Sequence, residues 1–272
     1  MKMILPPDWD EPSEGNAGLC SRFLSKSTKL RYGDMPYRLY EPMAADTKIP
    51  LVIYLHGADA AGSDNGIHLS MHDVGTFPVR DEVQRKHPCY VLAPQYGEMM
   101  HWSMRDIKEG LWTTIEDTVN MDKRIDRDRI YVYGYSAGGI GALGLIKEHP
   151  DYFAAAVSVC GSTGITDIEN ILKTPLWMIH AADDKIVRCS YRKGGNEPLM
   201  NLGSHDIYEW YKENGGKVKH PSSDIRYTEY PEGYMKEHYG VNPHCSWVAL
   251  SDPANRNIWE WMFSHTLTGG II

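Results

Sequence analysis

The chain has 272 residues, of which 42% are hydrophobic and 24% charged, and this length and composition indicate a single globular domain over residues 1–272. Acidic residues outnumber Lys and Arg by 36 to 28, for a formal net charge of −8, which argues against nucleic acids and anionic membranes as partners. The N-terminal residues lack a signal-peptide core, and no stretch approaches the roughly 18 consecutive apolar residues of a membrane span. We therefore expect a cytoplasmic protein.

The five cysteines are scattered along the chain and odd in number, a pattern that favours reduced thiols over a disulfide framework. None belongs to a CxxC pair, and neither an HExxH motif nor a spaced set of Cys and His indicates a bound metal. These patterns therefore give no indication of a bound metal.

The predicted elements begin with an irregular lead-in over residues 1–27. Residues 29–32 and 37–40, on either side of Gly33-Asp34, are predicted to form a β-hairpin. The apolar run at 50–57 is typical of a strand that helices cover on both faces. Such a strand belongs in the centre of an α/β sheet.

A second buried strand is predicted over residues 89–94, preceded by a helix over 79–86. Apolar residues then recur at helical spacing over 107–121, which predicts an amphipathic helix. The charged residues 122–129 that follow are interpreted as a solvated turn. This turn leads into the segment on which the functional interpretation depends.

Residues 130–147 carry the strongest functional signal. The Ile-Tyr-Val-Tyr of 130–133 predicts a buried strand, residues 134–138 read Gly-Tyr-Ser-Ala-Gly, and the apolar residues 140–147 predict a helix. A Gly-x-Ser-x-Gly turn between strand and helix indicates a nucleophile elbow, whose glycines permit the close approach that a strained serine backbone requires. Ser136 is therefore the candidate nucleophile. The alternative is a glycine-rich turn whose serine only caps the helix.

The rest of the chain continues the alternation of strands with helices. The predicted elements are strands over 154–159 and 175–180, a helix over 206–214, a strand over 224–230 and a helix over 258–265. This order predicts an α/β fold with a mostly parallel sheet covered on both faces. Residues 62–77 and 189–203 are the least regular stretches, and residues 189–223 are interpreted as an insertion or lid-like segment.

A serine hydroxyl needs an adjacent base, and this base needs a third group that holds it. In such an architecture the acid and the histidine follow the serine in that order, each after a later strand. Asp184 is the preferred acid because its spacing from His180 and Val187 fits an H-x-x-x-D-x-x-V turn. Asp183 is the alternative, and is otherwise expected to cap or brace the same turn.

The base is expected after the last strand, where the chain offers His220, His238 and His244. We prefer His244 because it lies in the loop between the strand that ends at Tyr230 and the terminal helix. His238 is the alternative. If all of them were surface histidines, Ser136 would have no base.

An ester or amide hydrolase also needs two preorganised N–H donors for the oxyanion of its tetrahedral intermediate. Ala137 directly follows the nucleophile and is predicted to supply one. The loop after the strand at 50–57 is predicted to supply the other through the amide of Ala58, with His56 and Gly57 shaping this loop.

Six motifs in this order resemble the α/β-hydrolase fold. Within that fold the chain is similar to compact bacterial esterases grouped with feruloyl esterases, polyhydroxybutyrate-depolymerase-like esterases and "predicted peptidases". The motifs lie at residues 55–58, 91–95, 126–130, 134–139, 180–187 and 244–247. The resemblance covers roughly residues 28–268 and implies a Ser/Asp/His hydrolase of carboxylic esters without metal or cofactor. The chain departs from the usual pattern at 58–62 and in longer segments at 190–224 and 232–243.

The same resemblance places Trp102 where related esterases carry an aromatic residue beside the active site. Trp102 is therefore a candidate for stacking on a phenolic acyl group or a sugar, with ordinary packing as the alternative. Tyr135 and Trp247 are further candidate substrate contacts, although Trp247 is preferred as a packing residue that holds the histidine loop. Met99, Met100 and Met104, which lie beside Trp102 in the sequence, would form an adaptable apolar wall.

We therefore expect a serine esterase that acts through an acyl-enzyme on small to medium acyl or hydroxycinnamoyl esters. The partner is a small-molecule ester, and a homodimer is possible. A serine peptidase of the prolyl-oligopeptidase type is the first alternative, because it would use the same triad. A noncatalytic binding protein on the same scaffold is the second.

Overall fold

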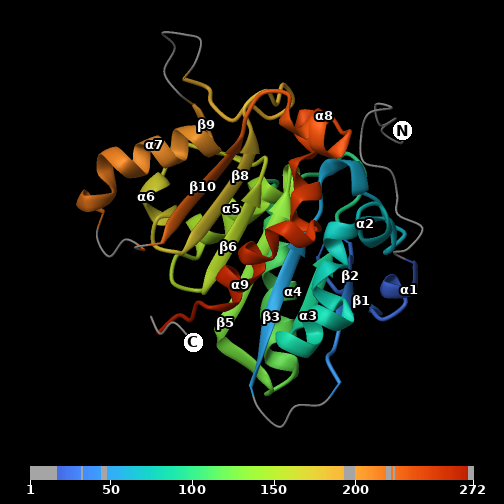
Figure 1. Ribbon diagram of the computed structural model, residues 1–272. Helices are drawn as coiled ribbons and strands as arrows, with labels where there is room; N and C mark the ends of the chain where they lie inside the picture. Colours follow the sequence, from blue (N-terminus) through green and yellow to red (C-terminus); the bar gives the residue numbers. More distant parts are fainter. Residues whose placement is uncertain are drawn as a thin grey trace.

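The computed structural model describes residues 17–31, 33–43, 48–192, 200–218, 222 and 224–268. In this part of the chain, eight strands form one twisted sheet in the order β1-β2-β4-β3-β5-β6-β8-β10 (Figure 1). The strands are β1 Leu24–Thr28, β2 Met35–Tyr40, β3 Ile49–Leu55, β4 Tyr90–Pro94, β5 Ile125–Tyr135, β6 Ala155–Val159, β8 Leu176–Ala181 and β10 Ile225–Tyr230. β2 runs antiparallel to β1 and β4, and the pairs from β4 to β10 are parallel. The prediction of a mostly parallel sheet is confirmed.

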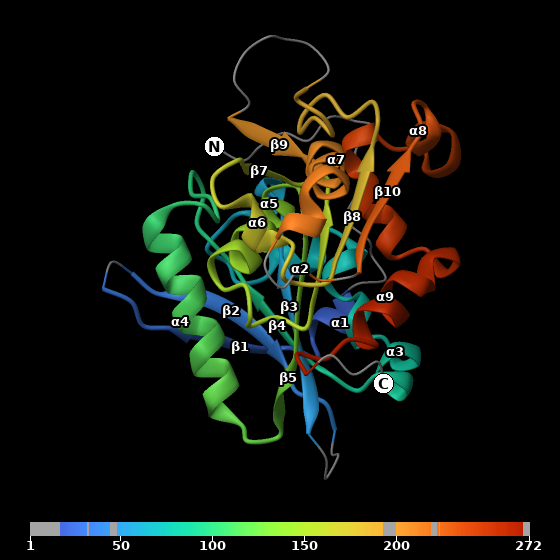
Figure 2. The same ribbon diagram turned by 90° about the vertical axis from the view of Figure 1, so that its left-hand side faces the viewer.

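Helices cover both faces of this sheet, and Figure 2 shows α4 on one side of the strands with α3 and α9 on the other. The helices are α1 Ala17–Cys20, α2 Ile67–Ser70, α3 Asp81–Lys86, α4 Arg105–Met121, α5 Ala137–Glu148, α6 Ile168–Ile171, α7 Ser204–Asn214, α8 Tyr234–Tyr239 and α9 Arg256–Phe263. Short 3₁₀ helices are η2 Ala58–Ala60, η3 Asp73–Gly75, η4 Phe77–Val79, η5 Gly215–Lys217, η6 Pro243–Leu250 and η7 Pro253–Asn255. A two-stranded ribbon pairs β7 Ser162–Gly164 with β9 Asn201–Gly203.

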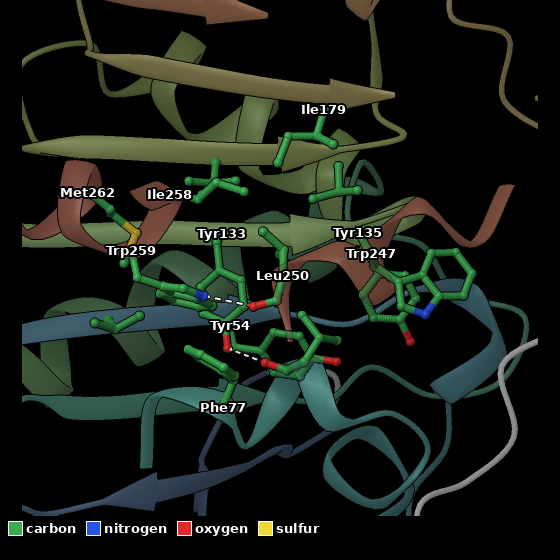
Figure 3. Packing of buried hydrophobic residues seen from close by; sticks show 14 of the residues in the cluster. Tyr54, Phe77, Tyr133, Tyr135, Ile179, Trp247, Leu250, Ile258, Trp259 and Met262 are labelled. Carbon is green, nitrogen blue, oxygen red and sulfur yellow. Dashed lines mark hydrogen bonds between the residues drawn. The ribbon is translucent and has the colours of Figure 1, made fainter. Parts of the chain in front are cut away.

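Alternate residues of the central strands enter two separate hydrophobic cores. Tyr131 and Tyr133 of β5 join the core under α3 and α9, whereas Ile130 and Val132 join the core under α4, α5 and α7. Successive side chains of a strand point to opposite faces, so a strand apolar at every position needs cover on both sides. Figure 3 shows the first of these cores, where Tyr133 lies beside Trp259 of α9.

Two N-terminal predictions are wrong in their boundaries. The first hairpin strand is β1 at Leu24–Thr28, within the expected lead-in, and not 29–32. The connection between β1 and β2 is therefore longer than Gly33-Asp34 alone. Lys29 and Asp34 form an ion pair within it. The rest of the lead-in contains α1 over Ala17–Cys20, while residues 1–16 lie outside the described residues.

The charge run at 122–129 is not wholly a turn, because β5 already begins at Ile125. Ile125 is buried and pairs with Ile49 of β3, while Arg127 and Asp128 between the two apolar parts of the strand are exposed. The strand therefore continues through the charges by burying the isoleucines on either side of them. The charged residues of this part of the strand are what favoured a turn in the sequence analysis.

The described part of residues 189–223, which the sequence analysis interprets as an insertion or lid-like segment, contains regular elements. β9, α7 and η5 occupy most of it, and Ile207 of α7 packs in the hydrophobic core that also contains Ile225 of β10. This helix covers the sheet in the ordinary way. Residues 193–199, 219–221 and 223 of the segment lie outside the described residues.

Candidate active site

The nucleophile elbow is built as the sequence predicts. β5 ends at Tyr135, α5 begins at Ala137, and Ser136 between them has φ 53° and ψ −120°, a left-handed backbone that costs a non-glycine residue energy and is typical of functional sites. The Ser136 N–H donates to the carbonyl of Val159 at 3.0 Å, which holds the strained residue in place. The serine is thereby fixed above the carboxyl ends of the parallel strands.

The two flanking glycines are required by close packing. A Cβ at Gly138 would lie 1.9 Å from the carbonyl oxygen of Leu55, and a Cβ at Gly134 would lie 2.5 Å from the carbonyl of Gly138. Real Cβ atoms do not come this close to backbone atoms. The turn can therefore pack against β3 only with glycine at both positions.

Ser136, His244 and Asp184 lie in a hydrogen-bonded chain. His244 Nε2 is 2.9 Å from Ser136 Oγ, and His244 Nδ1 is 2.7 Å from Asp184 Oδ2. The three residues come from the end of β5, the loop after β8 and η6, so the elements meet at one edge of the sheet. The side chains of His244 and Asp184 are buried. Such a chain can draw the proton from the serine hydroxyl when the serine attacks a carbonyl carbon.

Asp184 is held from both of its oxygens. Oδ1 accepts the N–H groups of Ile186 at 2.8 Å and Val187 at 3.1 Å, and Oδ2 contacts His244 and, at 3.2 Å, His180 Nε2. Burial acts to raise the pKa of Asp184, but the hydrogen bonds from His180 and His244 lower it to about 2. The carboxylate therefore stays ionised and can orient the imidazole of His244.

The alternative acid and base residues lie elsewhere. Asp183 Oδ2 accepts the N–H of Gly233 at 3.0 Å, so this carboxylate braces the start of α8. His238 lies exposed on α8 with its Nδ1 on the Tyr234 carbonyl, and His220 is outside the described residues.

His180 is a site residue whose role sequence reasoning missed, although it was noted as part of the H-x-x-x-D-x-x-V turn. It is buried on β8, its Nε2 contacts the Val187 carbonyl at 2.8 Å in addition to Asp184, and its Nδ1 contacts Ser204 Oγ at 3.0 Å. Nε2 therefore carries the proton that it shares between the Val187 carbonyl and Asp184. The spacing i to i+4 was visible in the sequence, but the contact was not.

Ala58 and Ala137 are the first residues of η2 and α5. N–H groups in the first turn of a helix have no acceptor within that helix, so they can bind an anion. The loop that carries Ala58 is held by the indole N–H of Trp102, which donates to the His56 carbonyl at 2.9 Å, and by His56 Nδ1 on the Gly57 carbonyl at 2.6 Å. His56 and Gly57 thus shape the loop, as expected.

The three aromatic residues considered as substrate contacts are interior residues in this structure. Trp102 is 1% exposed and packs against His56 and Tyr96. Tyr135 and Trp247 are fully buried, and their ring centroids lie 4.4 Å apart (Figure 3). Each of the three rings thus packs against protein neighbours in this structure. For Trp247 this agrees with the preferred interpretation.

A cavity of about 640 Å³ lies beside the loop of Ala58. Apolar side chains supply much of its wall, namely Ile67, Met71, Met99, Met100 and Met104. Asp64 and Glu98 lie among the lining residues, and in the part of the chain that the structure describes this lining includes neither lysine nor arginine. The methionine wall predicted from the sequence is thus present, but Trp102 does not line this cavity.

One group of potential metal ligands occurs among the described residues. Ligand atoms of Cys160, Asp184 and His244 lie within 4.8 Å of one another. Asp184 and His244 are already bonded to each other, and burial raises the pKa of the Cys160 thiol well above its usual value, which opposes the thiolate that binds metals. Cys160 Sγ lies 3.2 Å from the Ser136 nitrogen. The trio therefore belongs to the serine site.

Among the described helices, none combines the length and the apolar character that a membrane crossing requires. The sheet, the elbow and the Ser-His-Asp arrangement together define an α/β hydrolase. A solved thermostable esterase has the same fold, with a TM-score of 0.75 and 30% identity over 91% of this chain and 64% of the other. The chain belongs to the family described as "Putative esterase", which it matches over residues 28–200.

Two further proteins are similar to parts of the chain. "Putative esterase NocK" of Nocardia uniformis subsp. tsuyamanensis is 45% identical over 47 residues, which are 17% of this chain and 14% of that protein. The acylaminoacyl peptidase of Pyrococcus horikoshii has a TM-score of 0.54 at 15% identity, over 83% of this chain and 40% of the other. At this identity the likeness concerns the fold alone. This chain thus spans less than two thirds of each of these relatives.

Proposed function

We propose that this protein is a serine hydrolase of carboxylic esters that works through an acyl-enzyme. The observation that carries the proposal is the hydrogen-bonded chain from Ser136 Oγ through His244 to Asp184, at distances of 2.9 and 2.7 Å. Membership of an esterase family supports an ester as the substrate. The similarity of 91% of this chain to a solved thermostable esterase also supports an ester as the substrate.

The reaction begins when Ser136 Oγ attacks the carbonyl carbon of the ester and His244 Nε2 takes the hydroxyl proton. Asp184 keeps the other ring nitrogen of His244 protonated and stabilises the resulting imidazolium. The carbonyl oxygen becomes an oxyanion that the amides of Ala58 and Ala137 bind. When the C–O bond breaks, His244 returns the proton to the leaving alcohol. Water then attacks the acyl-enzyme by the same roles and releases the carboxylic acid.

The substrates we propose carry a small to medium acyl group, with hydroxycinnamoyl esters included. Support comes from the cavity beside Ala58, whose methionine side chains can adapt to aliphatic or aromatic groups. Asp64 and Glu98 in its wall, with no lysine or arginine among the described lining residues, disfavour an anionic substituent on the substrate. Neutral esters are therefore preferred over esters that carry a second carboxylate.

The test is hydrolysis of a graded panel by the wild type and by Ser136→Ala. The panel contains p-nitrophenyl esters from acetyl to octanoyl, methyl ferulate, monomethyl succinate as an anionic ester, and an aminoacyl anilide with the ester of the same aminoacyl group. We expect ester turnover in the wild type, a loss of about 10⁴-fold or more in kcat for Ser136→Ala, and little cleavage of the anilide. Faster cleavage of the anilide than of its matching ester would favour a peptidase, and equal turnover in the mutant would exclude Ser136 as nucleophile.

A further inference from the structure

Asp59 directly follows the proposed oxyanion donor Ala58, yet its side chain points into the protein. The side chain is 2% exposed, while residue 59 also belongs to the lining of the cavity. Its Oδ2 lies 2.6 Å from His72 Nε2, and its Oδ1 accepts the hydroxyl of Tyr135 at 3.0 Å. Both oxygens of this buried carboxylate are thus bound by protein groups.

These two hydrogen bonds join three segments of the active site. Tyr135 directly precedes Ser136, so one bond links the Ala58 loop to the elbow. The His72 ring lies 5.2 Å from the Trp247 ring, which in turn meets the ring of His244 edge-on at 5.5 Å. In Figure 3, Tyr135 and Trp247 lie together on the side of the core toward which the strand arrows point. Asp59 therefore connects the Ala58 loop to the nucleophile elbow by a hydrogen bond, and to the base His244 through the packed rings of His72 and Trp247.

The backbone of the Ala58 loop is closely packed against these contacts. A Cβ at Gly57 would lie 2.4 Å from the Tyr135 ring and 2.5 Å from Asp59 Oδ1, so the loop backbone lies directly against the Asp59–Tyr135 bond. Burial acts to raise the pKa of Asp59, but the hydrogen bonds from His72 and Tyr135, together with the electrostatic interaction with His72, outweigh burial and lower the pKa. A buried carboxylate is costly unless it is paired. Breaking either bond would therefore favour a different position of the carboxylate, and with it of the Ala58 backbone.

We propose that Asp59 is a positioning residue for ester hydrolysis: its bonds to His72 and Tyr135 aim the Ala58 N–H at the oxyanion. The inference rests on the proposed function. The Asp59 carboxylate itself makes no contact with the substrate, because both of its oxygens are turned toward the protein interior. Its effect is exerted on the transition state, in which the charge on the carbonyl oxygen develops.

The experiment compares the wild type with Asp59→Asn, which keeps the shape of the side chain and removes its charge. Asn offers only one acceptor oxygen where the carboxylate has two, so at least one of the hydrogen bonds to His72 and Tyr135 is lost or reversed in direction. We expect kcat to fall roughly 10- to 100-fold while KM stays within about threefold of the wild-type value. The reason is that the Ala58 N–H would be displaced from the oxyanion by a fraction of the hydrogen-bond length. Inhibition by an arylboronic acid, whose Ser136 adduct presents an oxyanion to the Ala58 amide, should weaken by a similar factor.

Tyr135→Phe is the second variant, because it removes the hydroxyl that donates to Asp59 Oδ1 and keeps the ring. It should show the same pattern with a smaller loss of kcat. Asp126→Asn is the matched control: Asp126 is also a buried carboxylate of 8% exposure, bonded to Arg129 at 2.7 Å, but it lies at the opposite end of β5. Its variant should leave kcat and boronate inhibition unchanged, whatever it does to the melting temperature.

Rates are expressed per active site, counted by labelling with a fluorophosphonate to completion, so that unfolded protein does not enter the comparison. If Asp59→Asn lowers only the melting temperature, or lowers kcat without weakening the boronate, the proposal is overturned. If Asp59→Asn does not fold, Tyr135→Phe decides by the same two readouts. Failure of the wild type to hydrolyse any ester would instead refute the proposed function, and the graded panel detects that separately.

Discussion

His180 and His244 contact the same oxygen of Asp184. His244 Nδ1 lies 2.7 Å and His180 Nε2 3.2 Å from Oδ2, while two backbone N–H groups occupy Oδ1. Four donors therefore converge on one buried carboxylate. Protonation of Asp184 would oppose all of these contacts, so the folded protein favours the ionised form.

This arrangement predicts a stability that depends on pH. The pKa of Asp184 is about 2 in the folded protein, below the ordinary value of roughly 3.9. A lowered carboxyl pKa stabilises the fold fully at pH values above the unfolded-state pKa, and this stabilisation is lost as the pH falls toward the folded-state pKa. The shift corresponds to roughly 2–3 kcal/mol in all, of which about half is lost by pH 3. Urea unfolding at pH 5 and pH 3 should show the free-energy gap between wild type and Asp184→Asn shrinking by about 1 kcal/mol. A constant gap would contradict the prediction.

Replacement of Asp183 and of Asp184 by Asn should have very different effects on kcat. Asp184→Asn replaces the partner of His244 Nδ1 and should lower kcat by about 10³- to 10⁴-fold. Asp183→Asn alters a bond to the Gly233 N–H and should change kcat less than about threefold while costing about 1 kcal/mol of stability. Steady-state hydrolysis of p-nitrophenyl butyrate by both variants decides the matter. A larger loss in Asp183→Asn would mean that the acid is misassigned.

Two glycines of α5 should respond in opposite ways to alanine. Gly138→Ala places a Cβ 1.9 Å from the Leu55 carbonyl oxygen, and we expect a loss of about 3 kcal/mol or more, or no soluble protein. Gly144→Ala meets no atom within 4 Å and should raise the free energy of unfolding by roughly 0.5–1 kcal/mol, since glycine is costly inside a helix. Thermal and urea unfolding of the two variants measure this, and equal effects would speak against the tight turn.

Trp102→Phe tests whether the indole holds the loop or binds substrate. Loss of the donor to the buried His56 carbonyl should cost about 1–3 kcal/mol of stability. Because the loop carries Ala58, kcat/KM should fall by one common factor for methyl ferulate and for p-nitrophenyl butyrate. A loss confined to the aromatic ester would show instead that Trp102 contacts the acyl group.

Much of the architecture was predictable because its signals are local. The apolar run at 50–57 and the glycines around Ser136 each allow one backbone solution, and the order Ser136, Asp184, His244 follows from the order of the strands. The predicted boundaries of β1 and β5 were wrong, because strand pairing in the tertiary structure overrides local polarity there. Ile125 joins β5 through Ile49, and β1 is placed by its pairing with β2, which no local propensity encodes.

By itself, the sequence determined the strand-turn-helix of the elbow, the alternation of strands with helices and the three residues that meet at the edge of the sheet. Only the tertiary structure decided what surrounds them. Trp102, Tyr135 and Trp247 are interior residues because other segments cover them, and the bond between Asp59 and Tyr135 joins residues 76 positions apart. The periodicity of a strand or helix records which face is buried, but it carries no information on which distant side chain will lie against that face.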